Sequence, residues 1–352
     1  MGAEKKCDKL FAEIDALAFF RNTEYFMPFS EGYSAITTRF TPRLCLRVND
    51  RTTLAGGCVL DLTAGDSSRL HAFPWLSFEY HLSSNTELTI GNIHGGQEHH
   101  LEAPLYDPER YFFNPLYHPE AGIQFRSNTH HWRGDTWLDW ENFLHPQDYA
   151  QERFLLATRQ EFFLLPEKSH WQVETPLTAC FAHRGGQFSA LDTNCGSLMN
   201  LHAGLRAVRH LGEGFLALYL PFYYYRDISG PDKRHNSSEP YHTPFQNGWG
   251  THPQAEARFG LGKHNKGRVN LGYWIAHRYL SSRGSYLFQS ASQDYETLTA
   301  YRRMITADAA FEHTYKGVTL GLDFQLFYDR TFLKADHAFD IYLRWSLRQP
   351  EV

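Results

Sequence analysis

The segment ITTRFTPRLCLRV, residues 36–48, alternates between two kinds of side chain. One face carries Ile36, Phe40, Pro42, Leu44, Leu46 and Val48, and the opposite face carries Thr37, Arg39, Thr41, Arg43 and Arg47. Successive side chains of a β-strand point to opposite faces. The segment therefore predicts a strand with an apolar face and a basic face.

The same alternation recurs along the whole chain. In VTLGLDFQLFYD, residues 318–329, the apolar side chains occupy every second position, and FDIYLRWSL, residues 339–347, repeats the pattern. We identify about sixteen such segments, each with one apolar and one polar face. The sequence therefore predicts an all-β protein.

Composition combines many aromatic residues with a hydrophilic average. Aromatic residues make up 16% of the chain, yet the mean hydropathy is -0.49. The longest apolar run, FLALYLPFYYY at 215–225, is far shorter than the roughly 20 residues of a membrane-spanning helix. The net charge of -5 argues against a nucleic-acid partner, because phosphate binding requires a basic surface.

Short and long connections alternate between the predicted strands. The connections at 49–51, 83–85 and 315–317 are short, whereas those at 95–120 and 226–253 are long. Short turns at one end and long loops at the other are typical of an up-and-down antiparallel barrel, with both chain ends on the short-turn side.

With this pattern the chain resembles the porin-like β-barrels of the Gram-negative outer membrane, down to the final strand FDIYLRW. The resemblance implies a closed up-and-down antiparallel transmembrane β-barrel of about 16 strands, range about 14–18. It also implies a location in the cell outer membrane. We expect one domain over residues 1–352, with the barrel at 8–347 and a short tail at 348–352. The first twenty residues do not read as a signal peptide.

Aromatic residues near strand ends are expected to form girdles at the two membrane interfaces. These are Phe20, Tyr25, Phe26, Tyr223, Tyr224, Tyr225, Tyr279, Tyr315 and Tyr328.

Charged residues on the polar faces are predicted to line the pore. They are Arg39, Arg43, Arg47, Glu13, Asp15, Glu79, Asp139, Glu141, Asp308, Glu312, Asp323 and Arg344. Two interpretations stay open. The charges either create a field that orients solutes and sets ion selectivity, or form a salt-bridge lattice that fills and rigidifies the interior.

The long loop at 95–120 is the third in order, and the third loop of porins commonly folds inward. Asp107, Glu109 and Arg110 are therefore candidates for a constriction, although the loop could equally cover the barrel mouth as a lid. The pairs His99–His100 and His130–His131 do not predict a metal site, because adjacent residues of an extended chain point in opposite directions. We expect no metal and no cofactor.

Cys180 and Cys195 flank a predicted hairpin loop and could form a disulfide there, or could remain two isolated thiols.

The most direct functional hypothesis is a porin-like channel for passive or weakly selective diffusion of small polar solutes, without enzymatic activity. Its partners would be outer-membrane lipid and small polar solutes, and a homo-oligomer or a lipoprotein partner is possible. One alternative is a closed structural barrel in an uptake or export complex that binds a partner through loop 226–253. Another is a soluble all-β carbohydrate-binding or carbohydrate-active protein.

A lipid-modifying barrel enzyme is a further hypothesis. It requires a serine or threonine nucleophile and a histidine together on the lipid-facing wall near an interface. None of the predicted strands supplies such a pair from the sequence alone.

Overall fold

The computed structural model describes residues 10–67, 70–107, 119–146, 150–165, 169–185, 196–229 and 243–347, and strands dominate them. The strands are β1 (Leu10–Glu24), β2 (Ser34–Asn49), β3 (Thr52–Thr63), β4 (Leu70–Ser83), β5 (Thr86–Asn92), β6 (Ala121–Asn128), β7 (Trp132–Asn142), β8 (Glu152–Phe163), β9 (Trp171–Gly185), β10 (Gly196–Leu211), β11 (Gly214–Asp227), β12 (Asn247–Thr251), β13 (Gln254–Gly260), β14 (Asn265–His277), β15 (Tyr301–Tyr315), β16 (Val318–Asp329) and β17 (Lys334–Leu347). Two short 3-10 helices, η1 (Gly96–His99) and η2 (Tyr286–Phe288), lie in loops.

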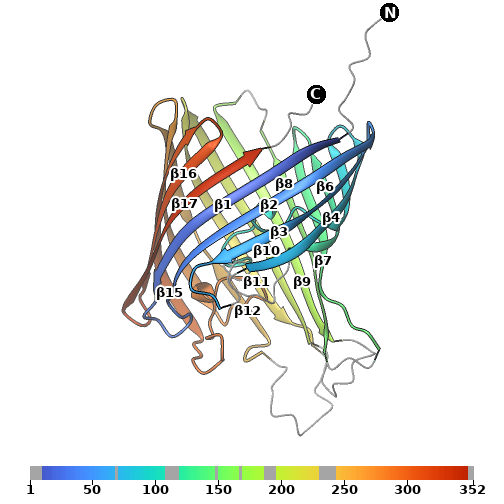
Figure 1. Ribbon diagram of the computed structural model, residues 1–352. Helices are drawn as coiled ribbons and strands as arrows, with labels where there is room; N and C mark the ends of the chain where they lie inside the picture. The colour runs from blue at the N-terminus through green and yellow to red at the C-terminus, as the bar shows by residue number, and fades with distance from the viewer. Residues whose placement is uncertain are drawn as a thin grey trace, which may run out of the picture.

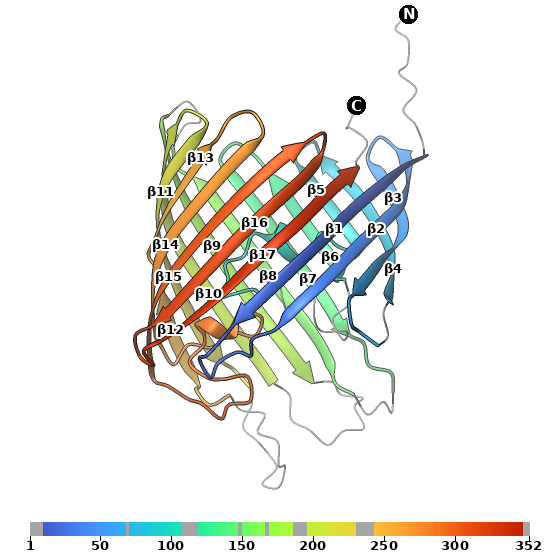
Figure 2. The same ribbon diagram turned by 60° about the vertical axis from the view of Figure 1, so that its left-hand side comes forward.

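The strands close into a barrel, as Figures 1 and 2 show. Each strand pairs antiparallel with its neighbours in the chain, and β1 pairs with both β2 and β17. The segments β12 and β13 flank residues 252–253 and together fill one place between β11 and β14. The wall therefore has sixteen positions, and the predicted closed antiparallel barrel of about sixteen strands is confirmed.

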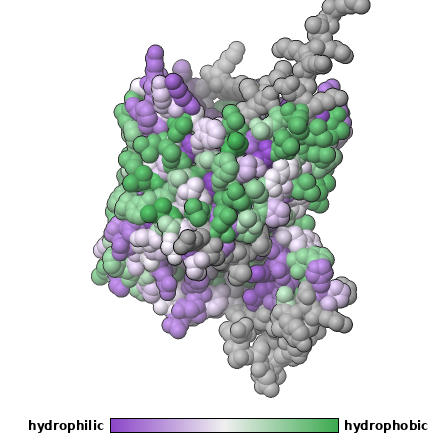
Figure 3. Space-filling model, in the orientation of Figure 1, coloured by the Kyte–Doolittle hydropathy of each residue, from purple (hydrophilic) through white to green (hydrophobic). Residues whose placement is uncertain are grey.

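The outer wall is apolar because the strands alternate as predicted. On β16 the side chains of Leu320, Leu322 and Phe324 point outward and each keeps 45% of its surface exposed. Figure 3 shows apolar side chains across the middle of the barrel and hydrophilic ones toward its ends. Lipid offers no hydrogen bonds, so only a closed sheet with an apolar exterior is stable in it. Among the described residues, no helix has the length and apolar character needed to cross a membrane.

The two loops that carry the 3-10 helices fold into the barrel. The loop between β5 and β6 carries η1, and the loop between β14 and β15 carries η2. They contact each other directly, because the Tyr279 hydroxyl donates to the Pro104 carbonyl at 2.9 Å and the Ser285 amide donates to the Ala103 carbonyl at 2.9 Å.

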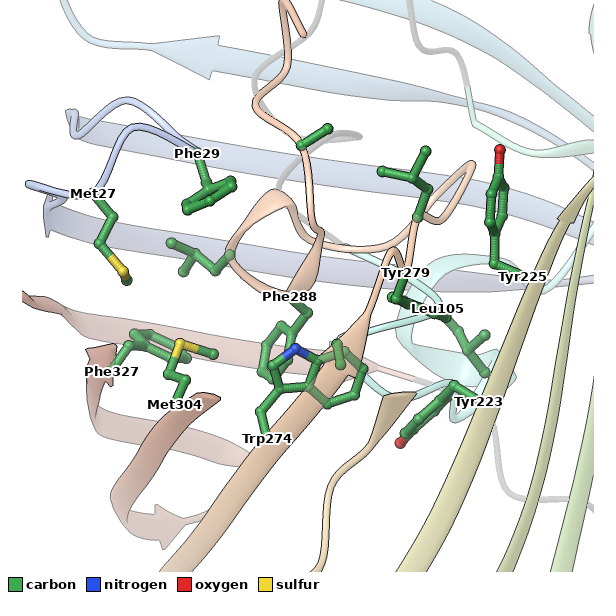
Figure 4. Close-up of a cluster of buried hydrophobic side chains, with 14 residues drawn as sticks. Met27, Phe29, Leu105, Tyr223, Tyr225, Trp274, Tyr279, Phe288, Met304 and Phe327 are labelled. Atoms are coloured by element: carbon green, nitrogen blue, oxygen red, sulfur yellow. The ribbon is translucent and has the colours of Figure 1, made fainter. Parts of the chain in front are cut away.

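A cluster of buried apolar side chains fills the lumen near the long loops (Figure 4). Met27 and Phe29 come from the β1–β2 loop, and Phe288 from η2, while Trp274 and Tyr223 point inward from the wall. All five are at most 4% exposed. The long-loop end of the lumen is therefore packed like a protein core.

Three residues predicted for the interface girdle lie in this cluster instead. Tyr223, Tyr225 and Tyr279 are fully buried in the interior. On β11, Tyr223 and Tyr225 share the inward face, whereas Tyr224 between them faces outward. The girdle prediction is wrong for these three residues because the barrel interior is packed with loops at this depth.

A buried ion pair braces the cluster. Arg302 on β15 binds Asp329 on β16 at 2.9 Å, and both side chains have no exposed surface. The same guanidinium donates to the carbonyls of Leu287 and Gln289 at 2.7 Å and lies 3.8 Å from the centre of the Phe29 ring. Arg302 thus ties two loops to the wall.

Candidate functional site

The arginines of the opening segment face the lumen, each beside acidic residues or an aromatic ring. Arg39 donates two hydrogen bonds to Asp61 of β3, at 2.7 and 2.6 Å. Arg43 lies 2.7 Å from Asp15 and 3.1 Å from Glu13 on β1. These contacts are those of a salt-bridge lattice. The guanidinium of Arg47 lies over the ring of Phe11.

The other predicted pore-lining residues also lie on the inner face. Arg268 bridges Asp308 at 3.0 Å and Asp323 at 3.1 Å. Arg344 lies 3.6 Å from Glu312, and Glu141 pairs with Arg283 of the inward loop. Glu79 lies 3.7 Å from His94. The Asp139 carboxylate accepts a hydrogen bond from the Ala121 amide at 3.0 Å.

A cavity of about 720 Å³ remains beside the inward loops. Arg39, Arg43 and Arg344 line it from the wall, and Glu98 and Glu120 line it from the third long loop. Asp15 also lines the cavity from the wall and pairs with Arg43, so the wall side carries three arginines and one carboxylate, and the loop side carries two carboxylates.

His99 fixes the third long loop against the wall. Its Nδ1 lies 2.7 Å from Asp135, its Nε2 lies 2.7 Å from Glu120, and its ring stacks on Trp137 at 3.6 Å. Burial disfavours the imidazolium, but the two carboxylates outweigh burial and raise the pKa of His99 to about 9. His99 is thus a charged structural anchor of the loop.

Glu102 is a second anchor of the same loop. It accepts hydrogen bonds from Arg159 at 3.0 Å and from the Tyr219 hydroxyl at 2.9 Å. Burial would raise its pKa, but Arg159 outweighs burial, and the pKa falls to about 2.

Of the three predicted constriction residues, Asp107 is bonded through its amide to the Arg283 carbonyl at 2.7 Å. Glu109 and Arg110 lie outside the described residues.

Cys180 does not face the position expected for a disulfide. It is a free thiol, buried on the inner face of β9, and Asn200 is its partner across β10. The hairpin register differs by five residues from the one that would oppose Cys180 and Cys195, and Cys195 itself lies outside the described residues.

No group of three or more His, Cys, Asp or Glu residues suited to a metal ion occurs in the described part of the chain.

Two histidines contact hydroxyl groups inside the barrel. His252 Nε2 lies 2.8 Å from the Thr306 hydroxyl, and His202 Nε2 lies 2.7 Å from the Tyr219 hydroxyl. Both histidines are buried. These pairs face the lumen, where loops pack over them, and an acyl chain held in the bilayer does not reach them.

A third such pair lies on the outer wall. His183 near the end of β9 and Ser197 near the start of β10 are direct cross-strand partners, and His183 Nδ1 lies 2.9 Å from Ser197 Oγ. Both alternate with inward residues such as Ala182 and Asn200, so both face outward. The pair lies at the long-loop end of the wall. It is the serine–histidine combination that sequence reasoning did not find.

Aromatic side chains continue the row occupied by this pair. Trp140 of β7 is the cross-strand partner of Phe154 of β8, which in turn pairs with His183. The ring centres are 5.5 Å apart for Trp140–Phe154 and 5.0 Å apart for Phe154–His183. A lipid-facing apolar surface therefore borders the hydroxyl–imidazole pair, as binding of an acyl chain requires.

Another outward serine has a different setting. Ser34 at the start of β2 accepts a hydrogen bond from Asn22 Nδ2 at 2.7 Å, and the same amide lies 3.5 Å from Glu24. Its described hydrogen bond is to an amide and not to an imidazole, so Ser34 lacks an adjacent general base.

The sequence matches the lipid A 3'-O-deacylase-type family over residues 2–349. The chain belongs to this family. The lipid A 3'-O-deacylase family is a family of enzymes, so the expectation of no enzymatic activity is wrong. No curated protein matches the sequence.

Solved structures with the same fold are outer-membrane proteins. A BenF-like porin from Pseudomonas fluorescens Pf-5 has a TM-score of 0.56 at 9% identity, covering 97% of this chain and 99% of its own. OmpT of Vibrio cholerae lacking loop L8 has a TM-score of 0.55 at 10% identity, covering 97% and 100%. OccK2 (OpdF) of Pseudomonas aeruginosa has a TM-score of 0.54 at 11% identity, covering 97% and 98%.

These neighbours and the closed barrel confirm the predicted porin-like fold and the location in the outer membrane. The barrel wall contacts membrane lipid. The soluble carbohydrate-binding or carbohydrate-active alternative is therefore wrong.

Proposed function

We propose that the protein is an outer-membrane esterase that removes an O-linked acyl chain from a glycolipid of the lipid A type, with Ser197 as nucleophile and His183 as general base. The observation that carries the proposal is the 2.9 Å contact between His183 Nδ1 and Ser197 Oγ on the outer wall. The long-loop end of such barrels faces the cell exterior, where the outer leaflet holds the substrate. Membership of a deacylase family supports the same reaction.

The chemistry follows from the pair. With its proton on Nε2, His183 accepts the Ser197 hydroxyl proton at Nδ1 while the oxygen attacks the ester carbonyl carbon. The tetrahedral intermediate expels the sugar oxygen, which takes the proton from His183. Water then hydrolyses the acyl-serine, again with His183 as base. The row formed by Phe154 and Trp140 would hold the acyl chain beside the reacting carbonyl.

The direct test is hydrolysis of purified lipid A in mixed detergent micelles, followed by mass spectrometry of the remaining glycolipid and the released fatty acid. Ser197→Ala should lower the rate about 10³-fold or more, because loss of a nucleophile removes the covalent path. Thr306→Ala is the matched control, since Thr306 is also a hydroxyl bonded to a histidine but faces the lumen.

Three results would contradict the proposal. Full activity of Ser197→Ala would remove the assigned site, and a loss in Ser34→Ala instead would move the nucleophile to the start of β2. Failure of the native protein to hydrolyse lipid A would remove the reaction itself.

A second proposed function is passive or weakly selective diffusion of small polar solutes through the lumen. It is supported by the 720 Å³ cavity between the arginines of the wall and the carboxylates of the third loop. Charged walls on opposite sides of a narrow path orient polar solutes and select ions. The predicted pore-lining residues and the predicted constriction residues Asp107, Glu109 and Arg110 belong to this proposal.

Single-channel recording in planar bilayers tests the second function. Stable conductance supports an open path, whereas protein that inserts without conductance contradicts it and favours the closed structural barrel. A homo-oligomer, a lipoprotein partner and docking through loop 226–253 stay predictions, and residues 230–242 of that loop lie outside the described residues.

A further inference from the structure

Two arginines lie side by side on the outer wall at the long-loop end. Arg303 of β15 is exposed and faces outward, because its neighbours Arg302 and Met304 are buried inside. Arg330 directly follows β16, and its amide donates to the Arg303 carbonyl at 2.8 Å. The Arg330 guanidinium reaches across the outer face to the Tyr273 hydroxyl of β14 at 3.4 Å.

Neither guanidinium lies within 4.0 Å of a carboxylate among the described residues. The outward positions at the same ends of β14, β15, β16 and β17 carry no acidic residue. They are Tyr273, Ile275, His277, Tyr301, Arg303, Ile305, Leu326, Tyr328, Ala335, His337 and Phe339.

Two adjacent cations without a counter-charge repel each other. The lumen arginines described above illustrate the alternative, since Arg39, Arg43, Arg268 and Arg302 each bind a carboxylate. Within the described part of the chain no carboxylate neutralises Arg303 and Arg330, so both guanidinium groups can bind an anion from outside the chain. The planar guanidinium donates paired hydrogen bonds that match the geometry of a phosphate.

We propose that Arg303 and Arg330, together with the Tyr273 hydroxyl, bind a phosphate group of an outer-leaflet glycolipid. A lipid phosphate fits this place better than a free one, because Tyr301 and Ile305 beside the arginines are 60% and 45% exposed on the lipid-facing wall. Interfacial tyrosines are stable at the depth of lipid headgroups.

This site is separate from the proposed esterase pair. From β10 to β15 the wall takes four strand steps, through β11, β12 and β14, or roughly 19 Å at about 4.8 Å per step. Binding of a phosphate at this distance requires no hydrolysis, so the inference goes beyond the proposed function.

The test measures retention of lipid A by the detergent-purified full chain, using native mass spectrometry. Two probes share the same acyl chains, one carrying its phosphates and one with them removed. The double variant Arg303→Gln, Arg330→Gln should bind the phosphorylated probe about tenfold more weakly or worse. Arg209→Gln is the matched control, since Arg209 is exposed on the outer face at the opposite, short-turn end of β10.

Equal retention by the native chain and the double variant would overturn the site. Equal retention of the two probes by the native chain would overturn the role of phosphate. If inorganic phosphate alone displaced the lipid and bound with the same affinity as the lipid, the proposal that the bound phosphate belongs to a lipid would be overturned. Loss of hydrolysis in Ser197→Ala with retained lipid binding would support both proposals as independent.

Discussion

The inner and outer faces of the barrel wall carry the same kinds of side chain, but the two faces differ in burial and in bonding partners. Arg302 and Arg303 are neighbours in the chain, yet the first is fully buried against Asp329 and the second is exposed without a carboxylate partner among the described residues. Thr306 and Ser197 each contact a histidine, but one pair is packed inside and the other faces lipid. The described arginine–carboxylate pairs lie on the inner face, whereas Arg303 on the outer face has none among the described residues.

The largest expected effect concerns the pairs Ser197–His183 on the outer wall and Thr306–His252 in the lumen. His183→Gln should lower lipid A hydrolysis about 10³-fold, because the base that activates Ser197 is lost. His252→Gln should leave the rate per folded molecule unchanged. Fatty-acid release measured by mass spectrometry checks both. Loss of hydrolysis in His252→Gln but not in His183→Gln would place the chemistry in the lumen instead of on the outer wall.

The adjacent arginines provide the next test. Arg302→Met should lower the free energy of unfolding by about 3–5 kcal/mol, because Asp329 is left buried without its counter-charge. Arg303→Met should change it by less than about 0.5 kcal/mol, as expected for an exposed site. Denaturant unfolding in detergent measures both. Similar losses in the two variants would mean that Arg303 also has a structural partner.

The His99 anchor predicts a pH dependence. Its pKa of about 9 exceeds the ordinary value of 6.5, so its stabilising effect is complete below about pH 6.5 and is lost as the pH rises through about 9. The pKa shift corresponds to a contribution of roughly 3 kcal/mol to the free energy of unfolding. Unfolding measured at these two pH values should show a loss of stability at the higher pH for the native chain but not for His99→Gln. Parallel curves would mean that the loop is held without the imidazolium.

The smallest effect is expected for the paired charges of the lumen. Replacing Arg39 by Gln together with Asp61 by Asn removes a matched pair, so the ion permeability ratio should change less than about twofold. Arg344→Gln should change it more, because its side chain is 53% exposed and lies 3.6 Å from Glu312. Reversal potentials in a salt gradient measure the ratio. A large shift in the double variant would favour the selectivity filter over the lattice.

Period-two alternation together with alternating loop lengths predicted the barrel. The apolar and basic faces of residues 36–48 determined which side chains meet lipid, and alternating loop lengths determined the up-and-down order. Both are local properties of an extended chain, so they can be read without knowledge of strand partners. Arg43 contacts Glu13 and Asp15 across the β1–β2 pair, whose two strands are consecutive in the chain.

Other features depended on the tertiary structure. The contact between His183 and Ser197 requires the register of the β9–β10 hairpin, and a shift of one residue would turn one of the two side chains into the lumen. Burial of Tyr223, Tyr225 and Tyr279 requires two loops to fold inward. The meeting of Arg303 and Arg330 on the outer wall requires β15 and β16 to pair in one register. Alternation in the sequence indicated which residues of a strand share a face, whereas strand register and loop packing decided which residues meet there and which aromatic residues are buried inside.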